Sequence, residues 1–297
     1  MKRYWLLGLV VGCGTAANAR FDDGGKNDTS GLDGGDPART DASFSGDSAV
    51  GDDCSEAAKL VYLFTQTAEL YSFDPPSKTL TSLGQLSCAT TASPNSMAVA
   101  RDGNAYVNYA DGTIFKVDVK TLKCSATSFT SSWTQMGMGF STNGTTNKDE
   151  TLFVAKTTIL GQTSELASVP LPPAALKPVQ KFASAFANLS PELTGTGDGK
   201  LYAFFVDSNF GTAAKLVEIS KTDATAVGTV TLSQITTVGA WAFSFWGGDF
   251  YLYYASATGN SKVGRYRPSD KSFVEYMTTS MRIVGAGVST CAPITPR

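Results

Sequence analysis

The chain has 297 residues, of which 42% are hydrophobic and 17% charged, and its 24 Lys and Arg against 26 Asp and Glu leave a net charge of -2. This length allows one large domain or two small ones, and no local excess of Lys and Arg is present that could neutralise several phosphates, so we expect no nucleic-acid partner. The complete absence of His excludes Ser-His-Asp and Cys-His catalysis and removes the commonest zinc ligand, so we predict no metal site and no cofactor and see no catalytic constellation.

The amino terminus has the pattern of an export signal, which we place at residues 1–12. Two basic residues precede an apolar run, 4–11, that is too short to span a bilayer. The run is followed by Cys13, and the sequence Val-Val-Gly-Cys resembles a bacterial lipobox, which implies that Cys13 is acylated and begins the mature protein. The alternative is an ordinary secretory signal cleaved near Ala19. We favour export with anchoring through lipid, at the outer membrane because Gly14 rather than Asp follows the cysteine.

Residues 13–53 are predicted to form a disordered tether. From residue 14 onward this segment carries nine Asp against three basic residues, and its four large apolar side chains are isolated from one another. Such a composition cannot offset the entropy cost of ordering. The Asp-Gly clusters lack the spacing of an EF-hand loop, so a calcium site is not favoured. Forty flexible residues would span on the order of 35 Å, enough to hold a domain clear of the lipid headgroups.

From Cys54 onward, one group of strand patterns recurs at steps of 44, 47, 49 and 49 residues. Aromatic residues flanked by apolar ones mark a first set of expected strands: 61–64, 105–107, 152–154, 201–203 and 250–252. Alternating apolar positions mark a second set: 70–74, 114–118, 166–170, 216–220 and 263–267. Small residues ending in a Gly-containing turn precede every unit but the earliest: 97–100, 138–141, 193–196 and 242–245. A further Thr- or Ser-rich strand follows most units, as at 120–122 and 270–273.

Four strands per unit, with small residues innermost, are typical of a β-propeller. The earliest unit lacks its innermost strand, and the apolar stretch 283–291 near the carboxyl terminus supplies it. We therefore predict an all-β, five-bladed propeller over residues 54–293, closed by that strand and followed by a tail, 294–297. A β-sandwich with chance spacing is the alternative. It is less favoured because the missing strand and the surplus strand complement each other.

Four cysteines remain after Cys13, and three pairings are possible in an exported chain. The repeat alignment selects one of them. It places Cys291 at the turn after the closing strand, beside the strand that follows Cys54. We therefore predict one disulfide between Cys54 and Cys291 and another between Cys88 and Cys124, the latter joining the outer parts of the first two blades.

Candidate ligand-binding residues come from equivalent positions at the start of the innermost strands. These positions hold Ser96, Gly137, Glu192, Trp241 and Val284, with Arg282 two residues before the last of them. Ser96, Glu192, Trp241 and Arg282 could form a small polar and aromatic mouth for a ligand. Alternatively, Glu192 pairs with Arg282 or caps a loop, and Trp241 packs between blades. A second aromatic group could either stack on sugars or form core between blades: Trp246, Tyr251, Tyr253 and Tyr254.

Three segments, 191–198, 241–250 and 283–293, resemble a group of uncharacterised bacterial propeller lipoproteins, and the resemblance extends to the lipobox and the Asp/Gly-rich tether. It implies a secreted, lipid-anchored propeller and no particular activity. We expect a monomeric binding or structural module of the cell envelope whose partners are the membrane, through the anchor, and an envelope protein or a glycan. The alternative is a glycan-active hydrolase with a pair of carboxylates, of which the equivalent positions supply only Glu192.

Overall fold

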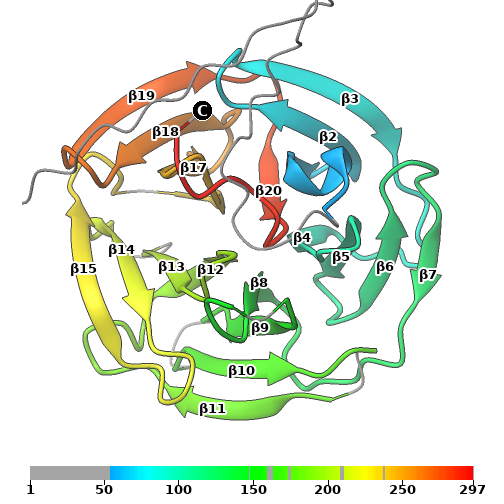
Figure 1. The fold of residues 1–297 in the computed structure, drawn as a ribbon, viewed down its shortest axis with the longest axis horizontal. Helices are drawn as coiled ribbons and strands as arrows, with labels where there is room; N and C mark the ends of the chain where they lie inside the picture. The colour runs from blue at the N-terminus through cyan, green and yellow to red at the C-terminus, as the bar shows by residue number, and fades with distance from the viewer. Residues whose placement is uncertain are drawn as a thin grey trace, which may run out of the picture. The chain divides into compact units, whose positions relative to one another are not determined.

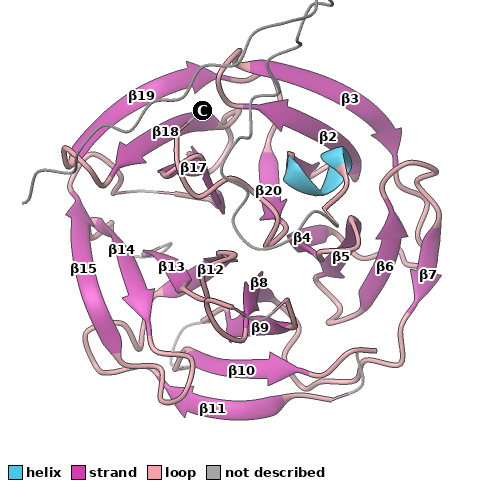
Figure 2. Ribbon diagram, in the orientation of Figure 1, coloured by secondary structure: helices cyan, strands magenta, loops and turns pink. Residues whose placement is uncertain are grey.

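The computed structural model describes residues 54–146, 148–158, 163–172, 175–207, 211–236 and 238–296. The predicted signal peptide, Cys13 and the tether lie outside these residues. Within them the chain forms antiparallel strands and one short 3₁₀ helix, η1 (Glu56–Lys59), as Figure 2 shows. No helix in these ranges is long and apolar enough to cross a membrane.

The strands form five four-stranded sheets arranged as blades around a ring (Figure 1). Blade one runs outward from the centre as β20 (Ile283–Val288), β1 (Val61–Thr65), β2 (Glu69–Asp74) and β3 (Thr79–Gln85). Blade two is β4 (Pro94–Val99), β5 (Asn104–Tyr109), β6 (Ile114–Asp118) and β7 (Cys124–Ala126). Blade three is β8 (Met136–Thr142), β9 (Glu150–Lys156), β10 (Glu165–Val169) and β11 (Lys177–Lys181). Blade four is β12 (Ser190–Gly195), β13 (Leu201–Val206), β14 (Ala214–Ile219) and β15 (Ala226–Leu232). Blade five is β16 (Ala240–Trp246), β17 (Asp249–Ala255), β18 (Lys262–Arg267) and β19 (Ser272–Thr278).

The fold is therefore the five-bladed β-propeller that the repeat predicts. One expected strand is wrong: residues 120–122 form a turn, and the outer strand of blade two is β7, which begins at Cys124. The reason is local. The Asp118 carboxylate accepts hydrogen bonds from the backbone N–H groups of Lys120 and Thr121, and Leu122 has a φ of 59°, so the chain reverses here before it can pair.

The ring closes by pairing its last strand with its first. β20 runs antiparallel to β1, with Val288 opposite Val61 and Ala286 opposite Leu63. Just beyond this pair, Cys54 and Cys291 form a disulfide with a Cα–Cα distance of 5.8 Å across 237 residues of sequence. Closure therefore combines ladder hydrogen bonds with a covalent link.

The second disulfide joins Cys88, after β3, to Cys124 in β7, with a Cα–Cα distance of 5.1 Å. It links the outer parts of blades one and two. Together with Cys54–Cys291, these are the pairings that the repeat alignment predicts. Two disulfides in one domain indicate an oxidising compartment outside the cytoplasm.

The hydrophobic core lies between blades, as five clusters of buried side chains, one at each blade-to-blade interface. Aromatic rings meet edge to face at several of them. Phe64 of blade one and Tyr109 of blade two have ring centroids 5.8 Å apart, and Phe73 of blade one meets Tyr251 of blade five at the same distance across the closing interface. Each blade is therefore stabilised mainly by its neighbours, so an open ring would expose two core faces.

The centre of the ring is crowded because five innermost strands converge there, each packed against the next. Glycines permit the approach at two points. A Cβ on Gly285 of β20 would lie 2.9 Å from the backbone nitrogen of Met97 in β4, and a Cβ on Gly137 of β8 would overlap the backbone carbonyl of Pro191 in β12. The small residues expected of the innermost strands therefore have a packing role.

Candidate functional site: a polar pocket on one face of the ring

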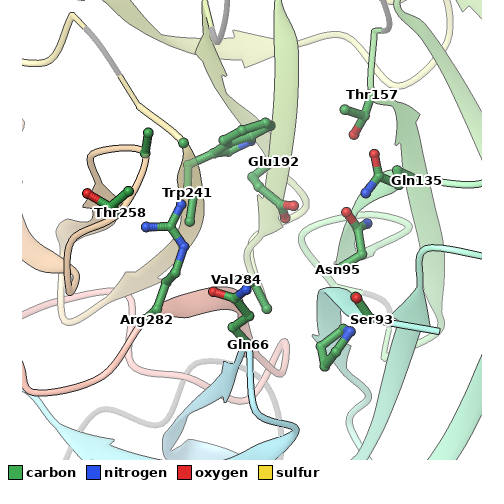
Figure 3. Close-up of a pocket in the computed structure, with 14 residues that line it drawn as sticks. Gln66, Ser93, Asn95, Gln135, Thr157, Glu192, Trp241, Thr258, Arg282 and Val284 are labelled. Atoms are coloured by element: carbon green, nitrogen blue, oxygen red, sulfur yellow. The ribbon is translucent and has the colours of Figure 1, made fainter. Parts of the chain in front are cut away.

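A cavity of about 620 Å³ opens on the face of the ring where the innermost strands begin and the second strands end. Residues from all five blades line it: Gln66, Ser93, Pro94, Asn95, Gln135, Thr157, Glu192, Gly239, Ala240, Trp241, Ala257, Thr258, Arg282 and Val284. Figure 3 shows Glu192, Trp241 and Arg282 on one side of the cavity, with Asn95, Gln135 and Thr157 facing them. This volume lies within the range of small-molecule sites.

Glu192 supplies a buried carboxyl group to this pocket. It is the third residue of β12, its side chain lines the cavity, and the residue is only 3% exposed. Its Oε2 accepts a hydrogen bond of 2.8 Å from the hydroxyl of Ser96, which is fully buried in β4. Burial raises the pKa of the Glu192 carboxyl well above its ordinary value, while hydrogen bonds from Ser96 and the Met138 backbone offset part of the shift. A perturbed carboxyl in a cleft is a feature of functional sites.

Arg282 brings a cation to the pocket wall and is held in place by backbone. It precedes β20, and its carbonyl accepts a hydrogen bond from the Gln66 backbone N–H. Its Nη1 donates to the carbonyl oxygens of Ser256 (2.6 Å) and Gly259 (2.8 Å) in the loop between β17 and β18. Both hydrogens of Nη1 are therefore used. The guanidinium edge formed by Nε and Nη2 is left to bind a further group.

Trp241 combines an apolar ring with an unused donor. It lies in β16 opposite Tyr254, and it packs against the cluster between blades four and five. Its Nε1 is buried and has no hydrogen-bond partner within the described part of the chain. A buried indole N–H usually has a partner, so this unpaired donor is an exception among the residues that line the pocket.

The remaining polar lining consists of amides and hydroxyls. Asn95 donates from Nδ2 to the Asn108 side chain (2.7 Å) and to the Met136 carbonyl (3.0 Å), which fixes its orientation and leaves its Oδ1 as an acceptor. Gln66 and Gln135 add two more side-chain amides. The wall therefore offers paired donors and acceptors, with ionisable side chains at only two of the described lining residues, Glu192 and Arg282.

The opposite end of the ring's centre has a second polar cluster, whose members bond to one another. Glu150 accepts hydrogen bonds from the Arg101 backbone N–H (2.6 Å) and the Thr290 hydroxyl (2.9 Å), and burial raises the pKa of its carboxyl. Lys221 donates to the Thr142 carbonyl at 2.6 Å. These contacts join separate blades and have a structural role.

The structure brings three of the four sequence-predicted residues to the pocket wall: Glu192, Trp241 and Arg282. Ser96 lies behind the wall, where it bonds to Glu192. The expected alternative pairing of Glu192 with Arg282 is not seen in the described residues, because Glu192 bonds to Ser96 and Arg282 bonds to loop carbonyls.

The second aromatic group is mostly core. Tyr251, Tyr253 and Trp246 are buried between blades five and one, and the Trp246 Nε1 donates to the Lys59 carbonyl. Tyr254 is partly buried against the cluster between blades four and five. Sequence reasoning missed Gln66, Asn95, Gln135 and Thr157. Asn95 and Gln135 were detectable in principle, since Asn95 directly precedes Ser96 and Gln135 lies two residues before Gly137, both positions that the repeat alignment had already singled out.

No protein-family profile matches the sequence, and no curated protein matches it. Similar solved structures include TolB from Acinetobacter baumannii (14% identity, TM-score 0.44, covering 74% of this chain and 53% of that one). They also include a prolyl endopeptidase (12% identity, TM-score 0.36, covering 74% and 33%) and hydrazine synthase from Kuenenia stuttgartiensis (11% identity, TM-score 0.44, covering 74% and 63%). The chain thus matches between a third and just under two thirds of these structures. Such similarities carry no inference about activity, and the five-bladed fold rests on the sheet topology itself.

Proposed function

We propose that this protein is a lipid-anchored, extracytoplasmic binding module of the cell envelope that holds a small polar ligand, or one unit of a larger glycan, in the pocket formed by all five blades. The observation that carries the proposal is the buried Glu192 carboxyl, fixed by Ser96 of another blade at the wall of that pocket. Placing such a group in a cavity costs free energy of folding, which is the usual mark of a site kept for binding or catalysis.

The anchoring part of the proposal rests on sequence. Cys13 follows the apolar run directly, and the two disulfides fit an exported protein. Residues 14–53 would then separate the ring from the membrane by a flexible spacer. A protein displayed in this way binds its target beyond the headgroups. The outer membrane remains the favoured location.

Binding is favoured over hydrolysis by the chemistry of the lining. Glycoside hydrolysis generally needs two carboxyl groups, one as acid and the other as base or nucleophile. Among the described residues that line the pocket, Glu192 is the one carboxylate. Glu192 is suited to holding a proton and donating a hydrogen bond, which a binding site can also use.

A ligand titration followed by NMR tests this function. The indole N–H of Trp241 reports on the pocket, and Trp133 and Trp246 serve as internal controls because neither lines it. Trp241→Phe identifies the Trp241 signal by its loss. Titrating the mature protein with soluble glycan fragments, neutral sugars, sugar acids and short peptides should give one class that moves the Trp241 signal saturably. If every class leaves that signal unmoved, the binding function is wrong; product formation from a bound fragment would instead favour the hydrolase.

A further inference from the structure

We propose that the pocket selects a ligand with a carboxylate on a hydroxyl-rich body, the chemistry of a sugar acid, and that Arg282 is the carboxylate anchor. This inference rests on the proposed binding function and names its ligand class. Three features of the wall carry it: the remaining edge of Arg282, the charge balance of the cavity, and the donors and acceptors around it.

The first feature is geometric. Because the Arg282 Nη1 is committed to the carbonyls of Ser256 and Gly259, the guanidinium cannot rotate freely, and the Nε–Nη2 edge is the part left to bind. These two nitrogens carry parallel N–H bonds at a spacing that fits the two oxygens of a carboxylate. Figure 3 shows the side chain reaching along the cavity wall beneath Trp241. The anchor is therefore oriented before the ligand arrives, which reduces the entropy cost of binding.

The second feature is charge. Arg282 has no carboxylate partner in the described ranges of the chain. The one carboxyl on the same wall, Glu192, is buried, with Ser96 and the Met138 backbone as its hydrogen-bonding neighbours. Burial raises the pKa of Glu192, so this carboxyl keeps its proton to a higher pH than an exposed one. The cavity wall therefore has a cation with no carboxylate bonded to it among the described residues. An anionic ligand pairs with this cation, whereas a cationic ligand is repelled.

The third feature is the rest of the lining. Trp241 offers an apolar ring of the kind that packs against a sugar face, and Asn95 offers an oriented acceptor. Gln66 and Gln135 each provide an amide that both donates and accepts, as a hydroxyl group does. Fatty acids and other apolar carboxylates leave these groups unpaired, which costs binding free energy. The lining therefore favours a carboxylate surrounded by hydroxyls.

Matched ligand pairs test the inference. Glucuronate and glucose differ only in a carboxylate against a hydroxymethyl group, and galacturonate and galactose form a second pair. In isothermal titration of the mature protein, at least one acid should bind at least about tenfold more tightly than its neutral parent. This ratio is what a hydrogen bond between charged groups typically adds to the affinity. Arg282→Gln should abolish this preference, and Arg282→Lys, which keeps charge but lacks the fork, should retain part of it. Lys262→Gln, on an exposed residue outside the pocket, should retain all of it.

The outcomes separate the two proposals. Equal binding of acids and parents, unchanged in Arg282→Gln, overturns the ligand class while leaving a binding pocket. Preference for the acids that survives Arg282→Gln, with the Trp241 signal moving, overturns the role of Arg282. If neither acids nor parents bind but another class moves the Trp241 signal, the sugar-acid inference is wrong and the binding function stands. If nothing moves that signal, both fail. Far-UV circular dichroism of each variant shows that the ring is intact.

Discussion

Replacing Glu192 by Gln should stabilise the protein by an amount that grows with pH. Gln has the size of the neutral acid and, like it, one acceptor oxygen and one donor group, so the bond from Ser96 can be kept. Burial raises the folded-state pKa of Glu192 above its ordinary value of 4.5. Above pH 4.5 the unfolded chain therefore loses the Glu192 proton while the folded chain keeps it.

The sign and slope follow from proton linkage. Where the folded state binds one more proton than the unfolded state, the free energy of unfolding falls by about 1.4 kcal/mol per pH unit. This loss begins near pH 4.5 and ends at the folded-state pKa of Glu192, above which the remaining penalty is constant. Burial also raises the pKa of Glu150, but that group is present in both proteins and cancels in the comparison. The difference between Glu192→Gln and the unsubstituted protein should thus rise by about 1.4 kcal/mol per pH unit from pH 4.5 upward.

Urea unfolding of both proteins, with disulfides intact, at half-unit steps from pH 4.5 to 8.5 measures this difference. Glu56→Gln is the matched control, because it removes a carboxylate whose side chain is 85% exposed, and it should follow the unsubstituted protein. A stability difference for Glu192→Gln that stays flat across this range would contradict this prediction, since it would mean that Glu192 is ionised in the folded state throughout.

Five further outcomes are expected. Cys13→Ala should release the protein from membranes or block its processing, and intact-mass analysis that finds an unmodified mature chain beginning after Ala19 would contradict this. A chain beginning at Asp53 should have a melting temperature within about a degree or two of that of the full mature chain, measured by calorimetry, because the tether contributes little to the free energy of unfolding. A much lower melting temperature would show that the tether contributes to folding. Cys291→Ala should fold but lose about 4 to 5 kcal/mol of unfolding free energy in the chain-entropy account. Ending the chain at residue 280 should cause aggregation, because β20 is removed. A truncated protein that is soluble and monomeric on gel filtration would argue against ring closure. Gly137→Ala should lower the melting temperature through its overlap with the Pro191 carbonyl, whereas Gly228→Ala, where a Cβ meets nothing within 4 Å, should not.

The fold could be predicted from the sequence because the repeat unit carries redundant information. Aromatic residues such as Tyr62 and Tyr106 occupy equivalent positions in successive blades and pack into equivalent interfaces. The closing strand was identifiable because Gly285 and Gly287 match the small residues of the other innermost strands. The outer strand of blade two was predicted at residues 120–122, but it begins at Cys124. The hydrogen bonds from the backbone to Asp118 make residues 120–122 a turn, and the sequence pattern did not show these bonds.

The pocket was only partly predictable. Glu192, Trp241 and Arg282 could be grouped because they occupy, or lie next to, equivalent ends of the innermost strands. Gln66 and Thr157 lie at the far ends of second strands, and their approach to the cavity depends on the twist of each blade. The burial of Glu192 also depends on neighbours in other blades, which a single sequence does not reveal. These features need the assembled ring.

A crystal structure of the protein grown with the sugar acid that binds best would show whether Arg282 anchors the carboxylate of the ligand. We expect the sugar ring to lie against Trp241 in the five-blade pocket, with its carboxylate oxygens within hydrogen-bond distance of Arg282 Nε and Nη2. Arg282 Nη1 should still be bonded to the carbonyls of Ser256 and Gly259. A ligand bound elsewhere on the ring, or bound in this pocket with its carboxylate turned away from Arg282, would contradict it.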